Sequence, residues 1–246
     1  MGGRLRLFGA TLLVALGPPL FAACDPPPAD RPPDLRMARL ADISLENTTD
    51  GRRLLRFTTV IVNVGRGAFE VHGSRSAGAS TMAVDQRVFD EGGGSRDLET
   101  TASMYFSGDG HNHWHVRDFE SYELVRRDNG RRVGTGAKHG FCFWDNTPFQ
   151  LSLPSAPQSP VYRGCGVAGD TRVTIGLSVG WGDRYGATIP DQYIDVTGPS
   201  PGGYRLTATA DAAGWFLEAD DGNNATWVDL RIGRHKVDIE GYGPSA

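Results

Sequence analysis

Three kinds of feature are scarce in this sequence: cysteine, with three residues among 246, long basic runs and long unbroken apolar runs. The formal net charge of −4 and the lack of a basic run argue against nucleic acid as a partner. No apolar stretch is long and unbroken enough to predict a membrane-spanning helix. Windows with the period of an amphipathic helix are lacking too, whereas 33 glycines and 15 prolines favour turns between short strands.

Residues 1–24 are typical of an export signal. Arg4 and Arg6 supply a basic start, a mostly apolar segment follows, and small residues precede Cys24. The five residues Leu20-Phe-Ala-Ala-Cys24 resemble a bacterial lipoprotein box, which makes Cys24 the acylated residue. A plain cleaved signal is the alternative. In either case we expect an exported protein, and with the lipid it is anchored to the membrane of the cell envelope.

The rest of the chain predicts a linker followed by one domain. Residues 25–36 are proline-rich and predict a stiff, extended linker, and residues 37–246 are long enough for one all-β domain. Strands are expected at residues 54–64, 68–72, 119–125, 132–143, 171–177, 193–196, 203–210, 215–218 and 227–232. Residues 73–103 and 178–186 are expected to be mostly loop. Short strands at this spacing predict an antiparallel β-sandwich with long loops.

Histidines alternate within residues 108–116, at His111, His113 and His115. In an extended segment their side chains emerge on one face. Imidazoles grouped in this way suit copper, zinc, iron or nickel. The outer two Cβ atoms of a flat strand would lie about 13 Å apart, so the strand must bend or bulge for all three rings to bind one ion.

A turn signal downstream places a lysine near these histidines. Asp128-Asn-Gly130 is the strongest hairpin signal in the chain and joins the expected strands at residues 119–125 and 132–143. The returning strand contains Lys138, so we expect Lys138 close to the histidine strand. The sequence does not fix the register of the hairpin.

Cysteine usage fits an exported protein. If Cys24 carries lipid, Cys142 and Cys165 remain as an even pair in an oxidising compartment. A disulfide closing a loop of this length stabilises the fold by roughly 3 kcal/mol in the chain-entropy model. The alternative, a copper or zinc thiolate site, lacks the close spacing typical of metal-binding cysteines.

Five motifs occur in a fixed order along residues 54–232. They are Leu54-Leu-Arg-Phe57 with Asn63-Val-Gly65, His111-Asn-His-Trp-His115 with Phe119 and Tyr122-Glu-Leu124, Gly136-Ala-Lys138 with Phe141-Cys142, Gly176-Leu-Ser178 with Gly180, Asp183 and Tyr185-Gly-Ala187, and Asp220-Asp-Gly-Asn-Asn224. In this order they resemble the catalytic domain of the lysyl oxidase family, copper amine oxidases that oxidise peptidyl lysine. The copper, lysine and tyrosine motifs are the informative ones.

The resemblance implies a site and a reaction. His111, His113 and His115 would bind copper, and Lys138 and Tyr185 would be joined into the quinone cofactor lysine tyrosylquinone. The implied reaction is oxidative deamination of primary amines or peptidyl lysine to aldehydes, with O₂ consumed and ammonia and hydrogen peroxide released. Lys138 must be an uncharged amine to add to the oxidised ring, so burial or a neighbouring charge must lower its pKa. Asp183, Asp191 and Asp195 are candidates for the catalytic base.

The chain also departs from the animal members of the family. Those enzymes have several disulfides around the site, including a cysteine before the histidine segment, where this chain has Gly110. A protein with a bacterial-type signal has no collagen or elastin to act on, so the substrate does not carry over. Two other functions stay open: a non-catalytic copper-binding protein of the envelope, and a hydrolase in which three histidines hold a metal-activated water.

Overall fold

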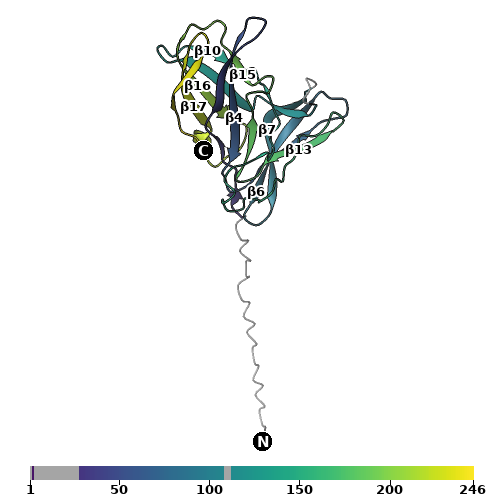
Figure 1. Cartoon of the computed structure of the whole chain (residues 1–246). Coiled ribbons are helices and arrows are strands. Elements are labelled where there is room, and N and C mark those ends of the chain that lie inside the picture. The colour runs from purple at the N-terminus through teal and green to yellow at the C-terminus, as the bar shows by residue number, and fades with distance from the viewer. Residues whose placement is uncertain (1, 3–27, 108–111) are drawn as a thin grey trace.

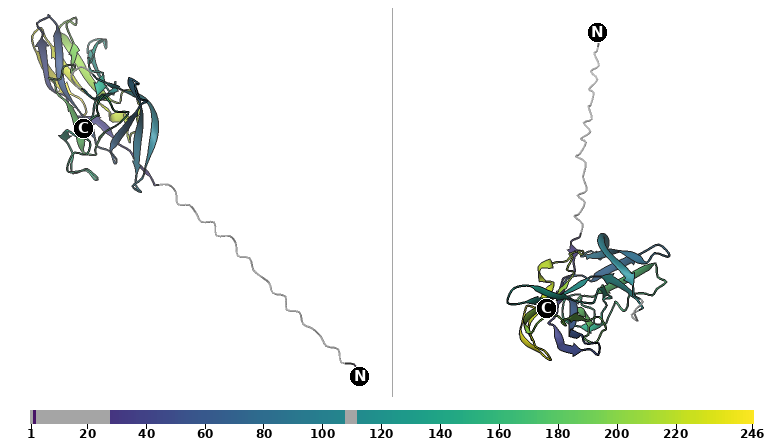
Figure 2. Two further views of the ribbon diagram at one scale, coloured as in Figure 1. Left: turned by 90° about the vertical axis from the view of Figure 1, so that its right-hand side faces the viewer. Right: turned by 90° about the horizontal axis from the view of Figure 1, so that it is seen from above.

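The structure is a computed structural model that describes residue 2, residues 28–107 and residues 112–246. The predicted signal with Cys24, and the first of the three alternating histidines, His111, lie outside the described residues. Figures 1 and 2 show the fold from three directions.

The described residues form an almost entirely β structure, as predicted. The strands are β1 (Asp30–Arg31), β2 (Leu35–Met37), β3 (Ala41–Asn47), β4 (Arg53–Asn63), β5 (Phe69–Ser74), β6 (Thr81–Asp90), β7 (Ser95–Phe106), β8 (Trp114–Arg117), β9 (Glu120–Arg126), β10 (Arg132–Thr135), β11 (Gly140–Phe141), β12 (Thr147–Pro148), β13 (Arg172–Leu177), β14 (Trp181–Tyr185), β15 (Tyr193–Asp195), β16 (Gly202–Ala210), β17 (Ala225–Ile232) and β18 (Val237–Tyr242). One 3-10 turn, η1 (Asp221–Asn223), precedes β17.

These strands form three antiparallel sheets. The first has the order β11-β8-β7-β6-β5-β13, with β1 added beside β6. The second has the order β10-β9-β16-β17-β18, and the third groups β2, β3, β12, β14 and β15 around β4. In Figure 1, β16 and β17 lie on one side of β4, and β6, β7 and β13 lie on the other.

Aromatic contacts pack the three sheets together. Phe57 of β4 meets Tyr122 of β9 edge to face, with ring centroids 5.0 Å apart. Phe69 of β5 packs on Phe119 and Phe143, with centroids 5.4 and 5.0 Å away. Such ring pairs add to the stabilisation that burial of their apolar area supplies. The core is therefore continuous across all three sheets, and the functional side chains described below lie at their junction.

Residues 73–103 are not mostly loop, so that prediction was wrong. They contain β6 and most of β7, which pair with each other over most of their length. Alternate β6 side chains, from Met82 to Val88, are buried, but one of the buried positions is the polar Gln86, which interrupts the hydrophobic alternation. Gln86 is a buried polar residue that bonds the backbone of Leu217 through both its amide nitrogen and its carbonyl oxygen. A polar residue on the buried face therefore hid the strand period.

Residues 215–218, expected as a strand, form no strand. The Asp211 carboxylate accepts hydrogen bonds from the backbone N–H groups of Trp215 and Phe216, both at 3.0 Å. The next N–H, from Leu217, is taken by Gln86. Because side chains satisfy these backbone donors, the segment needs no neighbouring strand.

The ordered sheet structure begins earlier than residue 37. Strand β1 lies within the stretch expected as linker, β2 begins in it, and β2 pairs with β4 over Leu35 to Met37. The backbone N–H of Leu35 donates to the Glu218 carboxylate at 2.6 Å. Pairing and capping thus hold the second half of the proline-rich segment on the domain.

Candidate active site

The histidine strand is bent where the spacing requires it. Asn112 has a φ of +52°, which breaks the extended backbone immediately before His113. The regular strand β8 then begins at Trp114 and pairs with β7, with His115 opposite Tyr105. The Trp114 side chain is almost completely buried and fixes the strand between the two histidines.

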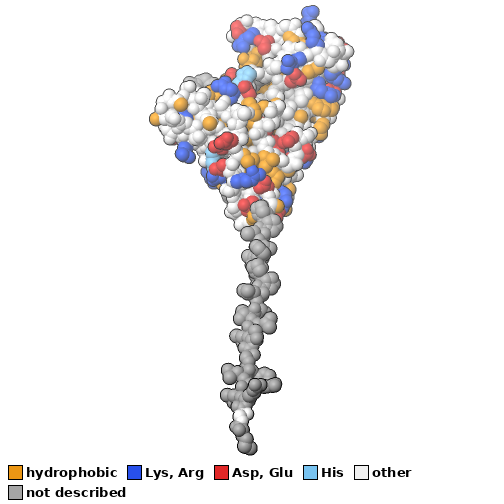
Figure 3. Space-filling model, turned by 180° about the vertical axis from the view of Figure 1, so that it is seen from behind, with side chains coloured by type: hydrophobic (Ala, Val, Ile, Leu, Met, Phe, Trp, Pro, Cys, Tyr) orange, Lys and Arg blue, Asp and Glu red, His pale blue; other side chains and the backbone are white. Residues whose placement is uncertain are grey.

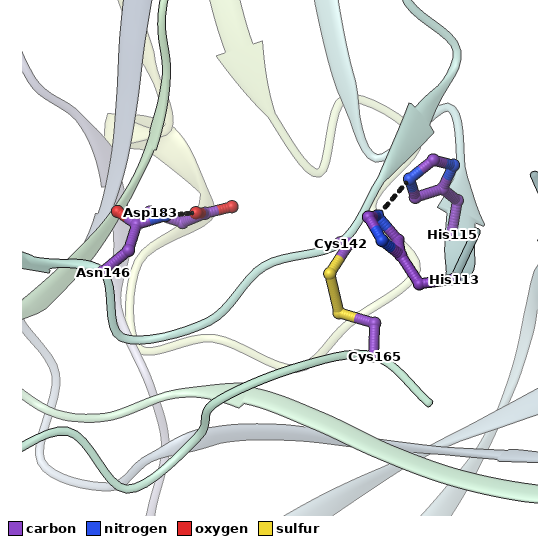
Figure 4. The surroundings of a disulfide bond; sticks show 6 residues. All are labelled: His113, His115, Cys142, Asn146, Cys165 and Asp183. Carbon is purple, nitrogen blue, oxygen red and sulfur yellow. Dashed lines mark hydrogen bonds between the residues drawn. A yellow bond between two sulfur atoms is a disulfide. The ribbon is translucent and has the colours of Figure 1, made fainter. Parts of the chain in front are cut away.

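The two described histidines converge. Their Nε2 atoms lie 2.7 Å apart and their ring centroids 4.5 Å apart. Figure 4 shows both rings turned toward each other beside a disulfide. Within residues 28–107 and 112–246 no group of three or more metal-binding side chains forms, and His111 lies outside those ranges. Two imidazole nitrogens that point to one place fit copper or zinc by donor type.

Strand β11 passes directly against the histidine strand. Gly140 and Phe141 pair with Arg117 and Val116 of β8. A Cβ atom at Gly140 would lie 2.6 Å from Nδ1 of His115, closer than real Cβ contacts allow. The absence of a side chain at residue 140 therefore lets the lysine-bearing segment approach the histidine ring.

Lys138 is placed by a crossing between two sheets. The returning strand expected over residues 132–143 is broken: β10 ends at Thr135, and β11 begins at Gly140 in another sheet. Between them Gly136 N–H donates to Tyr122 O at 2.9 Å, and Ala137 N–H donates to Tyr193 O at 3.0 Å. A Cβ at Gly136 would be 2.5 Å from the Tyr122 ring, so only glycine fits where the chain turns inward.

The structure brings Lys138 and Tyr185 together. The Lys138 side chain crosses the site so that its Nζ lies 4.9 Å from the centroid of the Tyr185 ring and 5.1 Å from that of Phe141. Lys138 and Tyr185 are each 6% exposed. The segment expected as a glycine-rich loop is strand β14 at residues 181–185, and it pairs with β4 so that Tyr185 lies opposite Thr59.

Asp183 is the base candidate that lies beside Tyr185. It is buried two residues before Tyr185 on β14 and accepts a hydrogen bond from the Asn146 amide. Burial raises the pKa of Asp183 well above its usual value. Burial and the charge of Asp183 in turn raise the pKa of the Tyr185 hydroxyl.

The other two base candidates lie further out. Asp191 lines a cavity of about 200 Å³ together with Lys138, His115 and Tyr105. Asp195 is an exposed residue at the end of β15. Of the three, Asp183 interacts with Tyr185 and Asp191 lines the cavity beside Lys138.

Sequence reasoning missed a buried carboxyl, Glu120. Its Oε2 accepts hydrogen bonds from the Tyr122 hydroxyl and, at 3.2 Å, from the Thr59 hydroxyl. Burial raises the pKa of Glu120 to about 7, although the bonds from Tyr122 and Thr59 and the charge of Lys138 lower it. The available signal was the alternation of β9, which puts Glu120 on the same buried face as Tyr122 and Leu124.

A buried amide in this network lacks an acceptor for its N–H groups in the part of the chain that is described. Glu120 Oε1 and Gln192 Nε2 have no hydrogen-bond partner among the residues that the structure describes. Gln192 Oε1 is 3.4 Å from the Tyr122 hydroxyl, so both atoms belong to the same network. Buried polar groups are almost always paired in folded proteins. A ring that gains oxygen atoms on oxidation would offer an acceptor for the Gln192 amide.

The predicted disulfide is present. Cys142 and Cys165 are bonded, with their Cα atoms 5.8 Å apart. Cys142 follows β11, and Cys165 O accepts a hydrogen bond from Trp114 N–H at 3.0 Å. The bond therefore ties the segment that binds the backbone of Trp114 to the segment that follows β11, next to the two histidines (Figure 4).

Fold and site define an all-β protein with a buried lysine–tyrosine pair beside a histidine-bearing strand. The lysyl oxidase family model matches residues 82–241. The chain belongs to the lysyl oxidase family.

Individual relatives match over part of their length. Human protein-lysine 6-oxidase is 33% identical over 132 residues, which cover 53% of this chain and 29% of that protein. Human lysyl oxidase homolog 1 is 35% identical over 121 residues, 49% of this chain and 19% of the relative. Human lysyl oxidase homolog 3 is 27% identical over 186 residues, 76% of this chain and 20% of the relative. The chain thus spans less than a third of each relative.

Proposed function

We propose that this protein catalyses the copper- and quinone-dependent oxidative deamination of primary amines or peptidyl lysine to aldehydes, with release of ammonia and hydrogen peroxide. The observation that carries the proposal is the 4.9 Å separation between Lys138 Nζ and the centroid of the Tyr185 ring. Reacting atoms must come within about 3 to 3.5 Å, which a small side-chain movement achieves from this position.

Each group has a distinct role in this proposal. His111, His113 and His115 would hold copper, and Lys138 and Tyr185 would form lysine tyrosylquinone. Together the copper, the quinone and O₂ supply the electrophilic carbonyl and the oxidising equivalents that amine oxidation needs. The burial of Lys138 and Tyr185 keeps water from the reacting atoms.

Other side chains serve the amine and its protons. The cavity lined by Lys138, His115 and Asp191 gives an incoming amine a route to the pair, and the Asp191 carboxylate favours a cation there. Asp183 lies against the Tyr185 hydroxyl, where it can hold or accept a proton.

The copper-loaded, aerobically matured protein tests the proposal. Intact mass and peptide mapping should detect a Lys138–Tyr185 crosslink, and a carbonyl reagent such as phenylhydrazine should form a stable adduct. A protein that binds copper but forms neither crosslink nor adduct is a copper-binding protein and not an oxidase.

The role of the histidines predicts a loss of copper affinity. Removal of a side chain that only supports a metal ligand lowers metal affinity by about 10- to 100-fold. Because His113 and His115 would be ligands themselves, His113→Ala and His115→Ala should each weaken copper binding at least that much. Competition with a chelator measures the affinity. His235→Ala is the matched control, because His235 is exposed on the loop before β18. Equal losses in all three variants would contradict the assignment.

We further propose that the protein is exported and anchored through a lipid on Cys24. In the described part of the chain no helix has the length and apolar character needed to span a membrane. Labelling of producing cells with a fatty-acid analogue should mark the native protein and not Cys24→Ala. Equal labelling of both would rule out Cys24 as the acylated residue.

A further inference from the structure

We propose that Glu120 accepts the ammonium proton of Lys138 before the crosslink forms, and so leaves Lys138 as a neutral amine. This inference rests on the proposed function, because it concerns how the same lysine becomes able to react. None of the five motifs that carry the family resemblance includes Glu120.

The fold fixes the Glu120 carboxylate beside the reacting pair. Glu120 begins β9, and its Oε2 is held by the Tyr122 and Thr59 hydroxyls, which also lie 3.1 Å from each other. Thr59 is the cross-strand partner of Tyr185, the residue whose ring Lys138 overlies. The Tyr122 ring lies 6.3 Å from that of Phe141, the second ring under Lys138 Nζ.

One oxygen of the carboxylate is available for a proton. Glu120 is 2% exposed, and its Oε1 has no hydrogen-bond partner among the described residues. Two hydroxyl donors on Oε2 stabilise the charged carboxylate, which is the form that can accept a proton. Lys138 lies close enough for its positive charge to lower the pKa of Glu120.

The neighbouring carboxyls are less suited to this step. Asp183 Oδ1 accepts from the Asn146 amide, and burial raises the pKa of Asp183 well above its usual value, which favours the neutral form. Asp191 lines the cavity beside Lys138 and so faces the incoming amine. Within the described residues the titratable groups around the pair also include Glu120, Tyr122 and the cavity-lining Tyr105, His115 and His139. A pKa of about 7 leaves Glu120 substantially ionised at neutral pH.

The transfer is balanced without any oxidant. An N–H bond of the Lys138 ammonium breaks, an O–H bond forms on Glu120 Oε1, and the nitrogen keeps its electron pair. A cation and an anion become two neutral groups. In a buried site this lowers the desolvation cost that two separate charges carry.

Maturation kinetics test the inference. The copper-free full chain is mixed with copper and O₂, and crosslink formation is followed by intact mass and quinone absorbance. Glu120→Gln should bind copper as tightly as the native chain but mature about 10²-fold more slowly at pH 7, the lower end of the effect of a positioned base. The maturation rate of the native chain should rise as the pH increases through about 7, as the Glu120 carboxyl loses its proton. The maturation rate of Glu120→Gln should not show this rise.

Glu123→Gln is the matched control. Glu123 lies on the same strand, but its side chain is 44% exposed and pairs with Arg132 at 3.0 Å. The variant should mature at the native rate and keep the native pH dependence. If Glu120→Gln also keeps both, the inference is overturned. If the native chain forms no crosslink at all, it is the proposed function that fails.

A second measurement decides the inference even if Glu120→Gln misfolds. Infrared spectroscopy of the copper-free chain follows the protonation of the Glu120 carboxyl as a function of pH. Labelled glutamate, together with Glu120→Gln or Glu120→Asp, assigns the carboxyl band to this residue. In Lys138→Met the charge that lowers the pKa of Glu120 is gone, so the carboxyl should take up its proton at a higher pH than in the native chain. An unchanged titration would show that the two groups are not coupled, and would overturn the inference.

Discussion

Lys138→Met and Tyr185→Phe are each expected to abolish crosslink formation and amine oxidation while copper still binds. Methionine cannot add to the ring, and phenylalanine has no phenol to oxidise. Because the proposed quinone would perform the redox chemistry, its loss should remove the whole enzymatic acceleration, which for enzymes is about 10⁶-fold or more. Peroxide release with a primary amine measures the activity, and intact mass measures the crosslink.

The chain offers a matched control for each variant. Lys236 is its only other lysine, and that side chain is 76% exposed beside Asp238. Tyr242 is partly exposed under Arg39 near the C-terminus. Lys236→Met and Tyr242→Phe should both mature and turn over normally. With two lysines in the sequence, a crosslinked peptide from the native chain is also unambiguous. Activity retained in Lys138→Met would exclude this lysine from the cofactor.

One face of the molecule carries mixed charges without a large patch of one sign among its described residues (Figure 3). Basic and acidic side chains are interspersed over the face shown in Figure 3. Many of them form ion pairs, such as Arg87 with Asp97 and Arg205 with Asp229. Under the proposed function, the Asp191 carboxylate in the cavity next to Lys138 is a charged group placed to attract a cationic amine.

Strands with uniform apolar faces could be predicted from the sequence. Residues 54–64 and 203–210 correspond to β4 and β16 within one residue at each end, because β-branched and alternating apolar residues mark them. Strand β6 could not be found in this way because Gln86 occupies its buried face and bonds to the distant Leu217. Residues 215–218 look like a strand, but Asp211 and Gln86 satisfy their backbone. Long-range polar contacts thus account for both errors.

Contacts between distant segments also limited what the sequence could predict about the candidate site. The residue types at 138 and 185 follow from the motif order, and the structure places the two side chains together. Glu120 was not predicted, because its role depends on Thr59, which lies in another sheet. Sequence alone does not fix how two sheets pack or which register their strands take. Alternation within β9 shows that Glu120 is buried, but not which side chains it meets.

The disulfide links the fold to the histidine site. The disulfide holds the segment around Cys165 in place, and this segment binds Trp114. Cys165 O accepts a hydrogen bond from the backbone N–H of Trp114, and Val167 O accepts one from its indole N–H. The same bond fixes Cys142, directly after the β11 strand that pairs with β8. This disulfide thus supports the strand that carries His113 and His115 at Trp114 and through β11.

Cys142→Ser/Cys165→Ser is therefore expected to weaken both stability and copper binding. The closed loop spans a sequence separation of 23 residues, and the chain-entropy model gives a loss of about 3 kcal/mol in the free energy of unfolding. Copper affinity should fall by about 10- to 100-fold, as when an outer support of a metal ligand is lost. Chemical denaturation and chelator competition measure the two effects, and reduction of the native protein should reproduce both. Lower stability with unchanged copper affinity would mean that burial of Trp114 alone holds the histidine strand in place.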